Sequence, residues 1–151
     1  MTTASVDRPP LTVIDTNVLL AATDRSRERH EAATAFLRDD PRRLAVSPQI
    51  IREYLAVMTR PAENNGLGMG AADAIANAEA VLAVTTLLSE GPRTTTRLLE
   101  LLLDGSAPGK QVHDANIVAC AIIHDAEAIV TMNRRHFARF AALVTVEDLT
   151  S

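Results

Sequence analysis

The sequence predicts an α/β fold, a three-layer α/β/α sandwich around a five-stranded, mainly parallel sheet. Short apolar segments that contain β-branched residues alternate with longer segments whose apolar residues recur at helical spacing. The 151 residues are enough for one domain, and no internal repeat, low-complexity tract or linker divides them. We therefore expect a single domain over residues 1–151, with a flexible N-terminus at 1–10.

The predicted strands and helices follow one another along the whole chain. In chain order they are a strand at 11–14, helices at 17–22 and 28–38, a strand at 44–46, a helix at 47–59, a turn at 63–70, a helix at 71–84, a strand at 85–88, a helix at 94–103, a loop at 106–111, a helix at 113–124, a strand at 128–131, a short helix at 134–140 and a strand at 143–146.

Proline and glycine set several of these boundaries. Ser47 followed by Pro48 is typical of a helix start, because serine caps free N–H groups and proline has none to cap. Pro61 cannot continue that helix. The segment at 63–70 holds a pair of asparagines and three glycines, which is typical of a turn. The helix at 113–124 is apolar nearly all round, so we expect it at the centre of the fold.

Composition limits the classes of function. The formal net charge is −4, which argues against a protein that coats nucleic acid by bulk electrostatics, although a local patch can still bind it. No segment approaches the ~18 uninterrupted apolar residues of a membrane span, and the N-terminus does not resemble a secretory signal. The single Cys120 excludes an intrachain disulfide and is expected to be buried and inert. These features predict a cytoplasmic protein that does not contact a membrane.

Three acidic residues, Asp15, Glu53 and Asp114, lie within strongly apolar sequence. In parallel α/β sheets, ligands bind beyond the carboxyl ends of the strands, and Asp15 follows the first strand directly. If the fold brings the three carboxylates together, they form a site for a divalent cation, and such cations commonly act on phosphate esters. No second His or Cys lies at ligand spacing from His113, which favours Mg²⁺ or Mn²⁺ over Zn²⁺.

Each acid also has a simpler explanation. Asp15 and Asp114 are at predicted helix starts, where aspartate is a common cap. Glu53 falls on the edge of its helix's buried face, which also suits a solvated residue paired with Arg52 or Arg60. The individual residues do not decide between these explanations.

Four short motifs resemble those of one family. They are Asp15-Thr16-Asn17, Arg52-Glu53, His113-Asp114-Ala115, and Thr131-Met132-Asn133 followed by Phe137. In this order they resemble the motifs of PIN-domain ribonucleases, and the chain is most similar to the VapC toxins of bacterial toxin–antitoxin systems. The resemblance covers essentially the whole chain. It implies a five-stranded parallel sheet, a Mg²⁺- or Mn²⁺-dependent endoribonuclease that cleaves cellular RNA, a homodimer, and neutralisation by a small VapB-like antitoxin.

The resemblance also implies roles for individual residues. It makes Asp15 and Asp114 the principal metal ligands, and Glu53 the third acid of the catalytic site. Asn17 would orient Asp15, and Thr131 belongs to the supporting motif. The family often has an aspartate where this chain has Asn133. Because an amide supplies no charge, we expect one well-held metal ion and leave a second one open.

Two further predictions concern the surroundings of the site. Arg134 and Arg135 are either contacts for RNA phosphates or an ordinary exposed helix start. The two N-terminal helices either offer an apolar groove to a partner helix of the antitoxin or bury the same side chains in the core. The residues in question are Leu19, Leu20, Phe36 and Leu37.

Other functions remain open at this stage. A housekeeping PIN nuclease that processes RNA would have the same site residues. A non-catalytic PIN-like module that binds RNA or protein would not bind the metal. A phosphohydrolase with Asp15 as nucleophile would need a second acid two residues later, where this chain has Asn17.

Overall fold

The computed structural model describes residues 9–104, 109 and 111–149. Most of the predicted flexible N-terminus at 1–10 and of the predicted loop at 106–111 therefore lies outside the described residues. Within the described ranges, no helix has the length and apolar character needed to cross a membrane.

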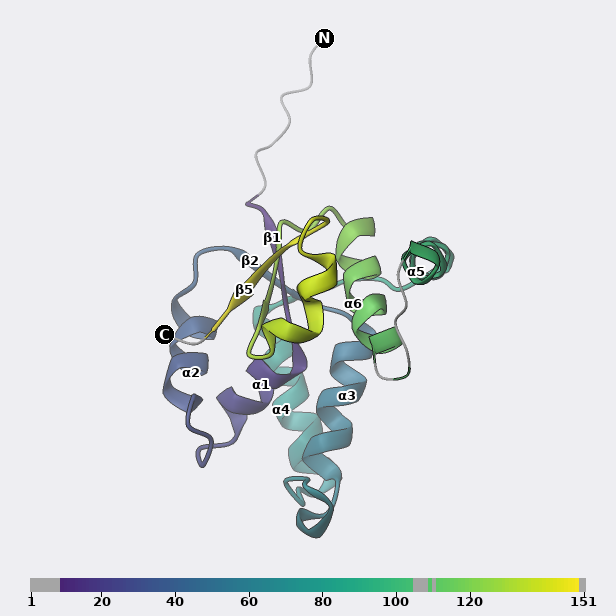
Figure 1. Cartoon of the computed structure of the whole chain (residues 1–151). Coiled ribbons are helices and arrows are strands. Elements are labelled where there is room, and N and C mark those ends of the chain that lie inside the picture. Colours follow the sequence, from purple (N-terminus) through teal and green to yellow (C-terminus); the bar gives the residue numbers. More distant parts are fainter. Residues whose placement is uncertain (1–8, 105–108, 110, 150–151) are drawn as a thin grey trace.

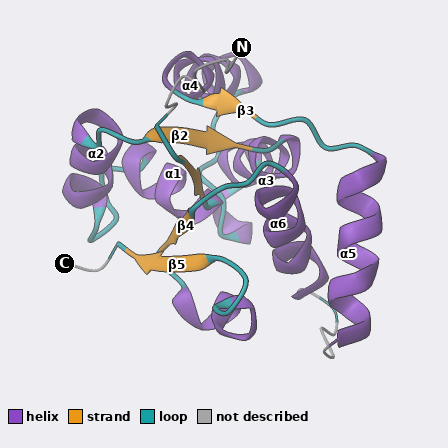
Figure 2. Cartoon of the chain, turned by 90° about the horizontal axis from the view of Figure 1, so that it is seen from above, coloured by secondary structure: helices purple, strands orange, loops and turns teal. Residues whose placement is uncertain are grey.

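The described chain is organised around one parallel sheet of five strands, as the sequence predicts. The strands are β1 (Leu11–Ile14), β2 (Arg43–Val46), β3 (Thr86–Leu87), β4 (Ala128–Thr131) and β5 (Thr145–Asp148). Their order is β3-β2-β1-β4-β5, every neighbouring pair is parallel, and Figure 2 shows them side by side. After β3 the chain passes to the other half of the sheet, so the strand order reverses between β1 and β4. In such sheets, ligands bind where this reversal occurs, at the carboxyl ends of the strands.

Helices flank the sheet on both sides. They are α1 (Thr16–Thr23), α2 (His30–Asp39), α3 (Pro48–Thr59), α4 (Ala71–Val84), α5 (Pro92–Asp104) and α6 (Gln111–Ile123), together with the 3₁₀ helices η1 (Ala62–Asn64) and η2 (Arg134–Phe140). In Figures 1 and 2, α2 lies on one side of the sheet and α5 and α6 lie on the other. The predicted three-layer arrangement is therefore confirmed.

Most predicted boundaries agree with the structure, and the clearest difference is at β5. This strand begins at Thr145 rather than at 143, because the N–H groups of Leu143 and Val144 donate to the carbonyl of Phe140 and continue the turn after η2. The helix predicted at 113–124 also begins earlier than expected. Since α6 starts at Gln111, Asp114 lies within its first turn and is not its cap.

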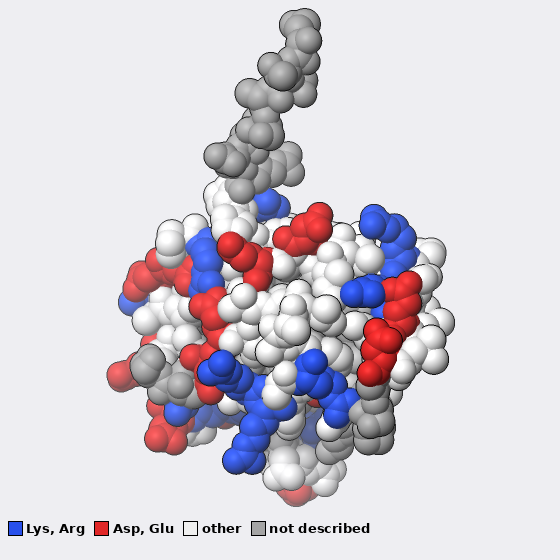
Figure 3. Space-filling view, turned by 45° about the horizontal axis from the view of Figure 1, so that its top comes forward, with Lys and Arg blue, Asp and Glu red and all other residues white. Residues whose placement is uncertain are grey.

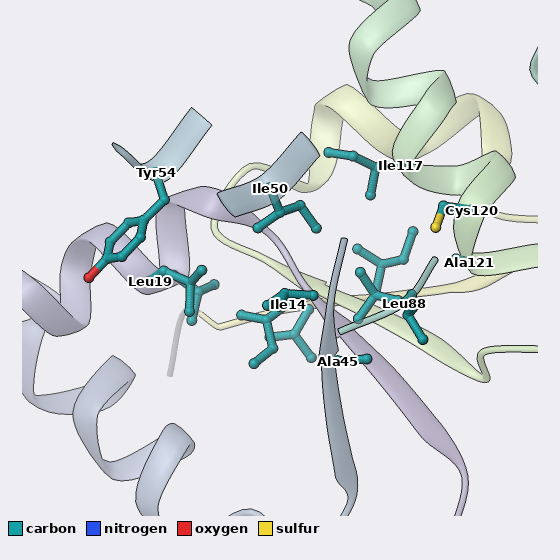
Figure 4. Packing of buried hydrophobic residues seen from close by; sticks show 14 of the residues in the cluster. Ile14, Leu19, Ala45, Ile50, Tyr54, Leu88, Ile117, Cys120 and Ala121 are labelled. Carbon is teal, nitrogen blue, oxygen red and sulfur yellow. The ribbon is translucent and has the colours of Figure 1, made fainter. Parts of the chain in front are cut away.

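The core lies between the sheet and the helices. Figure 4 shows Ile14 of β1, Ile50 of α3 and Ile117 of α6 within one cluster, and all three are buried. Ile14 directly precedes Asp15, while Ile50 and Ile117 each lie three residues from one of the other acids. The core therefore fixes the backbone near all three acids.

The cysteine prediction is also confirmed. Cys120 is buried in the same core, where burial and the nearby charge of Glu90 raise the pKa of its thiol to about 11. A thiol with this pKa is protonated at neutral pH, so it is a poor nucleophile.

Candidate active site

Asp15 lies at the junction of β1 and α1 and is only 8% exposed. Its Oδ1 accepts a hydrogen bond from the backbone N–H of Thr16 (2.8 Å), so it caps α1. Its Oδ2 accepts from the hydroxyl of Thr131 at the end of β4 (2.7 Å). The cap predicted as an alternative to a functional role is therefore real, but it engages one oxygen and leaves the other facing the strand ends.

The Thr131 hydroxyl has a fixed direction. It accepts hydrogen bonds from the side-chain amide of Asn17 (3.4 Å) and from the backbone N–H of Asn133 (3.0 Å). Because both lone pairs are occupied, its one hydrogen is directed to Asp15. Asn17 also accepts from the N–H of Met132 (3.1 Å). Asn17 was expected to orient Asp15; in the structure its amide donates to Thr131, which in turn donates to Asp15.

Glu53 lies in the second turn of α3 and is partly buried. Its Oε2 accepts from the hydroxyl of Thr16 (2.9 Å), and its Oε1 accepts from the side-chain amide of Gln49 (2.8 Å). The partners of its carboxylate are therefore neutral side chains that face the site. The alternative of a solvated residue paired with an arginine on the same helix does not describe this arrangement.

Asp114 projects from the first turn of α6, with 21% of its side chain exposed. Its Oδ2 lies 3.8 Å from Nδ1 of His136, and the other ring nitrogen of His136, Nε2, lies 3.0 Å from the side-chain amide nitrogen of Asn133. His136 therefore links Asp114 to the segment that follows β4, a contact that the sequence did not indicate.

The electrostatics show that the three acids share one space. Burial raises the pKa of Asp15 to about 6, opposed by its hydrogen bonds from Thr131 and Thr16 and increased further by the charges of Asp114 and Glu53. Burial also raises the pKa of Asp114, an effect reduced by His136 and increased by Glu53. The fold therefore places three carboxylates from β1, α3 and α6 close enough to repel one another.

The donor atoms of this site suit a hard divalent cation, but they do not form a complete ligand shell. Carboxylate oxygens are the preferred ligands of Mg²⁺ and similar ions, and a cation would relieve the repulsion between them. Within the described residues, however, no three His, Cys, Asp or Glu side chains are arranged so as to hold a metal ion. Each oxygen of Glu53 accepts one hydrogen bond, from Thr16 or from Gln49, and keeps a further lone pair.

The remaining predicted site residues lie at the start of η2. Arg134 and Arg135 are both exposed, and they directly follow Asn133. This position is compatible with contacts to RNA phosphates and with an ordinary exposed helix start. On the face shown in Figure 3, basic side chains occur in separate groups among acidic ones, and no single sign of charge covers the surface.

Several polar residues around the site were not predicted. They are Gln49, Glu90, Asn116 and His136. Gln49 is the one that the sequence could have revealed, because it lies one helical turn before Glu53 on the same face. The others meet the site only through long-range contacts.

The chain belongs to the PIN-domain family, whose sequence model matches residues 12–143. The fold is also that of solved toxin–antitoxin structures. VapBC-1 from nontypeable Haemophilus influenzae has a TM-score of 0.67 at 17% identity, covering 93% of this chain and 99% of that chain. DNA-bound VapBC from Salmonella typhimurium has a TM-score of 0.67 at 18% identity, with 93% and 98% coverage.

A third similar structure is Mycobacterium tuberculosis VapC20, described as a Sarcin-Ricin loop cleaving toxin. Its TM-score is 0.63 at 17% identity, covering 78% of this chain and 86% of that chain. At such low identities the similarity shows a VapC-like PIN fold. No curated protein sequence matches the chain significantly.

Proposed function

We propose that this PIN-domain protein is a Mg²⁺- or Mn²⁺-dependent endoribonuclease. The observation that carries the proposal is the group of three mutually repelling carboxylates at the carboxyl ends of the central strands. Asp15 and Asp114 would be the principal metal ligands, and Glu53 the third acid. When bound, the ion would activate a water molecule for attack on the phosphodiester and offset charge on the leaving oxygen.

The residues around the acids have supporting roles in this proposal. Thr131, held by Asn17, keeps one oxygen of Asp15 in place. Arg134 and Arg135 would bind RNA phosphates near the point of cleavage. Asn133 supplies no charge, so the proposal requires one tightly held ion.

The direct test is cleavage by Asp15→Asn and Asp114→Asn. Each change removes a proposed ligand charge, so we expect RNA cleavage to fall about 100-fold or more while the fold is kept. Asp73→Asn, at an exposed position on α4, is the matched control and should cleave normally. EDTA should abolish activity, and the products should carry 5′-phosphates. Retained cleavage in either site variant, or 2′,3′-cyclic phosphate ends, would contradict the proposal.

We further propose that the protein is the toxin of a toxin–antitoxin pair, acts on cellular RNA in the cytoplasm and is neutralised by a VapB-like partner. A pocket of ≈ 420 Å³ between α1, α2, α3 and α4 supports this, because an apolar helix can bind in such a groove. Its lining includes Leu37 and Val84, and also Leu19 and Tyr54, which belong to the core. Of the other predicted groove residues, Leu20 belongs to the core and Phe36 packs against it.

Growth on expression tests the toxin proposal. The wild-type protein should arrest growth, Asp114→Asn should not, and a small gene beside the toxin gene should restore growth. Arrest by wild type and Asp114→Asn alike would show that toxicity does not come from cleavage. Cleavage of a defined precursor RNA without growth arrest would instead favour a housekeeping nuclease, and absence of Mn²⁺ binding would favour a non-catalytic module.

A homodimer is also part of the proposal. Large apolar side chains are exposed on β3 and α5, at Leu87, Leu99 and Leu103, and they offer surface to a second copy. Light scattering should give twice the mass of the chain, and a monomer at micromolar concentration would contradict this point.

A further inference from the structure

The side chain of Gln49 joins the two helices that carry Glu53 and Asp114. It is only 5% exposed, and its amide nitrogen donates to Oε1 of Glu53 (2.8 Å) and to the backbone carbonyl of His113 (2.9 Å). His113 directly precedes Asp114 on α6. One amide group therefore contacts an acid on α3 and the backbone beside an acid on α6.

Asn116 fixes the orientation of the Gln49 amide. The amide nitrogen of Asn116 donates to Oε1 of Gln49 (2.6 Å) and to a carboxylate oxygen of Glu90, in the loop between β3 and α5. Because an amide nitrogen only donates, Gln49 must present its oxygen to Asn116 and its N–H groups to the site. Every polar atom of the Gln49 side chain is then paired, as expected of a buried amide.

We propose that Gln49 is a positioning residue that sets the placement of Glu53 relative to Asp114, and that Asn116 and Glu90 hold it in its working orientation. The inference deepens the proposed nuclease function and rests on it for its catalytic meaning. Gln49 does not contact substrate in this proposal. It acts through Glu53.

The alternative is that Gln49 only stabilises the packing of α3 against α6. The two roles differ in one respect. A positioning residue matters for metal binding only while Glu53 is present, whereas a packing residue matters to the same extent with or without Glu53. A double-mutant cycle separates them.

The test compares Mn²⁺ affinity by isothermal titration calorimetry. Gln49→Met keeps the size of the side chain and removes its hydrogen bonds, and we expect Mn²⁺ to bind about 10-fold more weakly, the usual effect of losing a residue that orients a ligand. In Glu53→Ala, the same Gln49→Met change should alter affinity less than about twofold. The chain's other glutamine provides the matched control. Gln111→Met, on α6, should bind Mn²⁺ like the wild type.

The outcomes separate the inference from the proposed function. Wild-type Mn²⁺ affinity in Gln49→Met, or an equal loss in the Glu53→Ala background, would overturn the positioning role. If the wild-type protein bound no Mn²⁺, the proposed function would fail, and the metal-free protein would still test the contact. In its NMR spectrum the side-chain amide of Gln49 should exchange slowly with solvent, and Glu53→Ala should accelerate that exchange. Fast exchange in the wild type would overturn the inference.

Discussion

The site has two halves that are held in different ways. Asp15 belongs to the strand half, where the backbone leaves β1, and it is held by its own cap of α1 and by Thr131 of the neighbouring strand. Glu53 and Asp114 belong to the helix half, where the side chain of Gln49 on α3 donates to Glu53 on the same helix and to the backbone carbonyl of His113 on α6. Asp15 is almost completely buried, whereas the other two acids are partly exposed.

This difference indicates which parts of the site are rigid. The register of the parallel sheet places Asp15 beside Thr131, because Ile14 pairs with Val130 and each of the two polar residues comes directly after one member of this pair. In the helix half no sheet register exists, and the buried side-chain amide of Gln49 connects the two helices instead. We therefore expect packing and charge, as well as hydrogen bonds, to matter in the strand half, and single hydrogen bonds to be the main determinant in the helix half.

The largest effect should come from Ile14→Ala, which breaks the strand half through its packing. Ile14 is fully buried, and removing three carbons from such a position costs about 2–5 kcal/mol of unfolding free energy. Urea denaturation followed by circular dichroism measures the change. At Leu143, which is exposed, the same truncation to alanine should cost less than about 0.5 kcal/mol. Equal losses at the two positions would show that the strand half is not the rigid part.

The next effect is the pH dependence caused by Asp15 in the metal-free protein. Its pKa is about 6 in the fold against an ordinary value of 3.8, so the folded state binds the proton more tightly than the unfolded chain. The resulting stability is fully present below about pH 4 and is lost as the pH rises through about 6, a total of about 3 kcal/mol. In EDTA, wild type should therefore lose this stability relative to Asp15→Asn between about pH 4 and pH 7.

The comparison with Asp15→Asn cancels the titrating groups that do not interact with Asp15. Asp24 and Asp40 have lowered pKa values because they accept hydrogen bonds, from Ser26 and Arg42 respectively. Their contribution to stability therefore increases as the pH rises, which is the opposite of the effect of Asp15. Both are present in wild type and variant. If the difference in unfolding free energy between the two proteins stayed constant from about pH 4 to pH 7, the pKa of Asp15 would not be raised in the fold.

A smaller effect should follow from Thr131→Val, which removes the hydroxyl that donates to Asp15 and accepts from Asn17 and Asn133. The change leaves a buried oxygen of Asp15 without its donor, which costs about 1–3 kcal/mol and should weaken Mn²⁺ binding about 10-fold. Thr131→Ser keeps the hydroxyl and should restore most of the affinity. Equal behaviour of the two variants would mean that the methyl group, and not the hydroxyl, is what matters.

The sequence predicted the strand half better than the helix half, for a physical reason. The apolar strand and the Asp15 that directly follows it can be recognised within a few positions of the sequence, and the sheet then determines what lies beside them. Gln49 lies 64 residues from its α6 partner His113. No local pattern encodes that contact, because it depends on how two helices pack.

The same reasoning explains the boundary errors. The apolar residues that begin at Leu143 have the composition of a strand, but the hydrogen bonds to Phe140 hold the first of them in a turn. Likewise, α6 begins before the apolar pattern of its sequence does, since Gln111 and Val112 are only partly buried. In both places local backbone hydrogen bonds, and not the apolar pattern, set the end of the element.

The smallest expected effect concerns Arg134, which adjoins the strand half without belonging to its buried network. If this exposed guanidinium binds an RNA phosphate, Arg134→Ala should weaken RNA binding and reduce its dependence on salt concentration by about one released ion. Mn²⁺ affinity should stay unchanged, because Arg134 is not among the proposed ligands. Filter binding of a defined RNA in EDTA, repeated over a range of salt concentrations, measures the slope without cleavage.

Arg60→Ala, at the exposed end of α3, is the matched control. Identical salt slopes for both variants and wild type would identify Arg134 as an ordinary exposed helix start and confine the site to the three acids and their hydrogen-bonded neighbours.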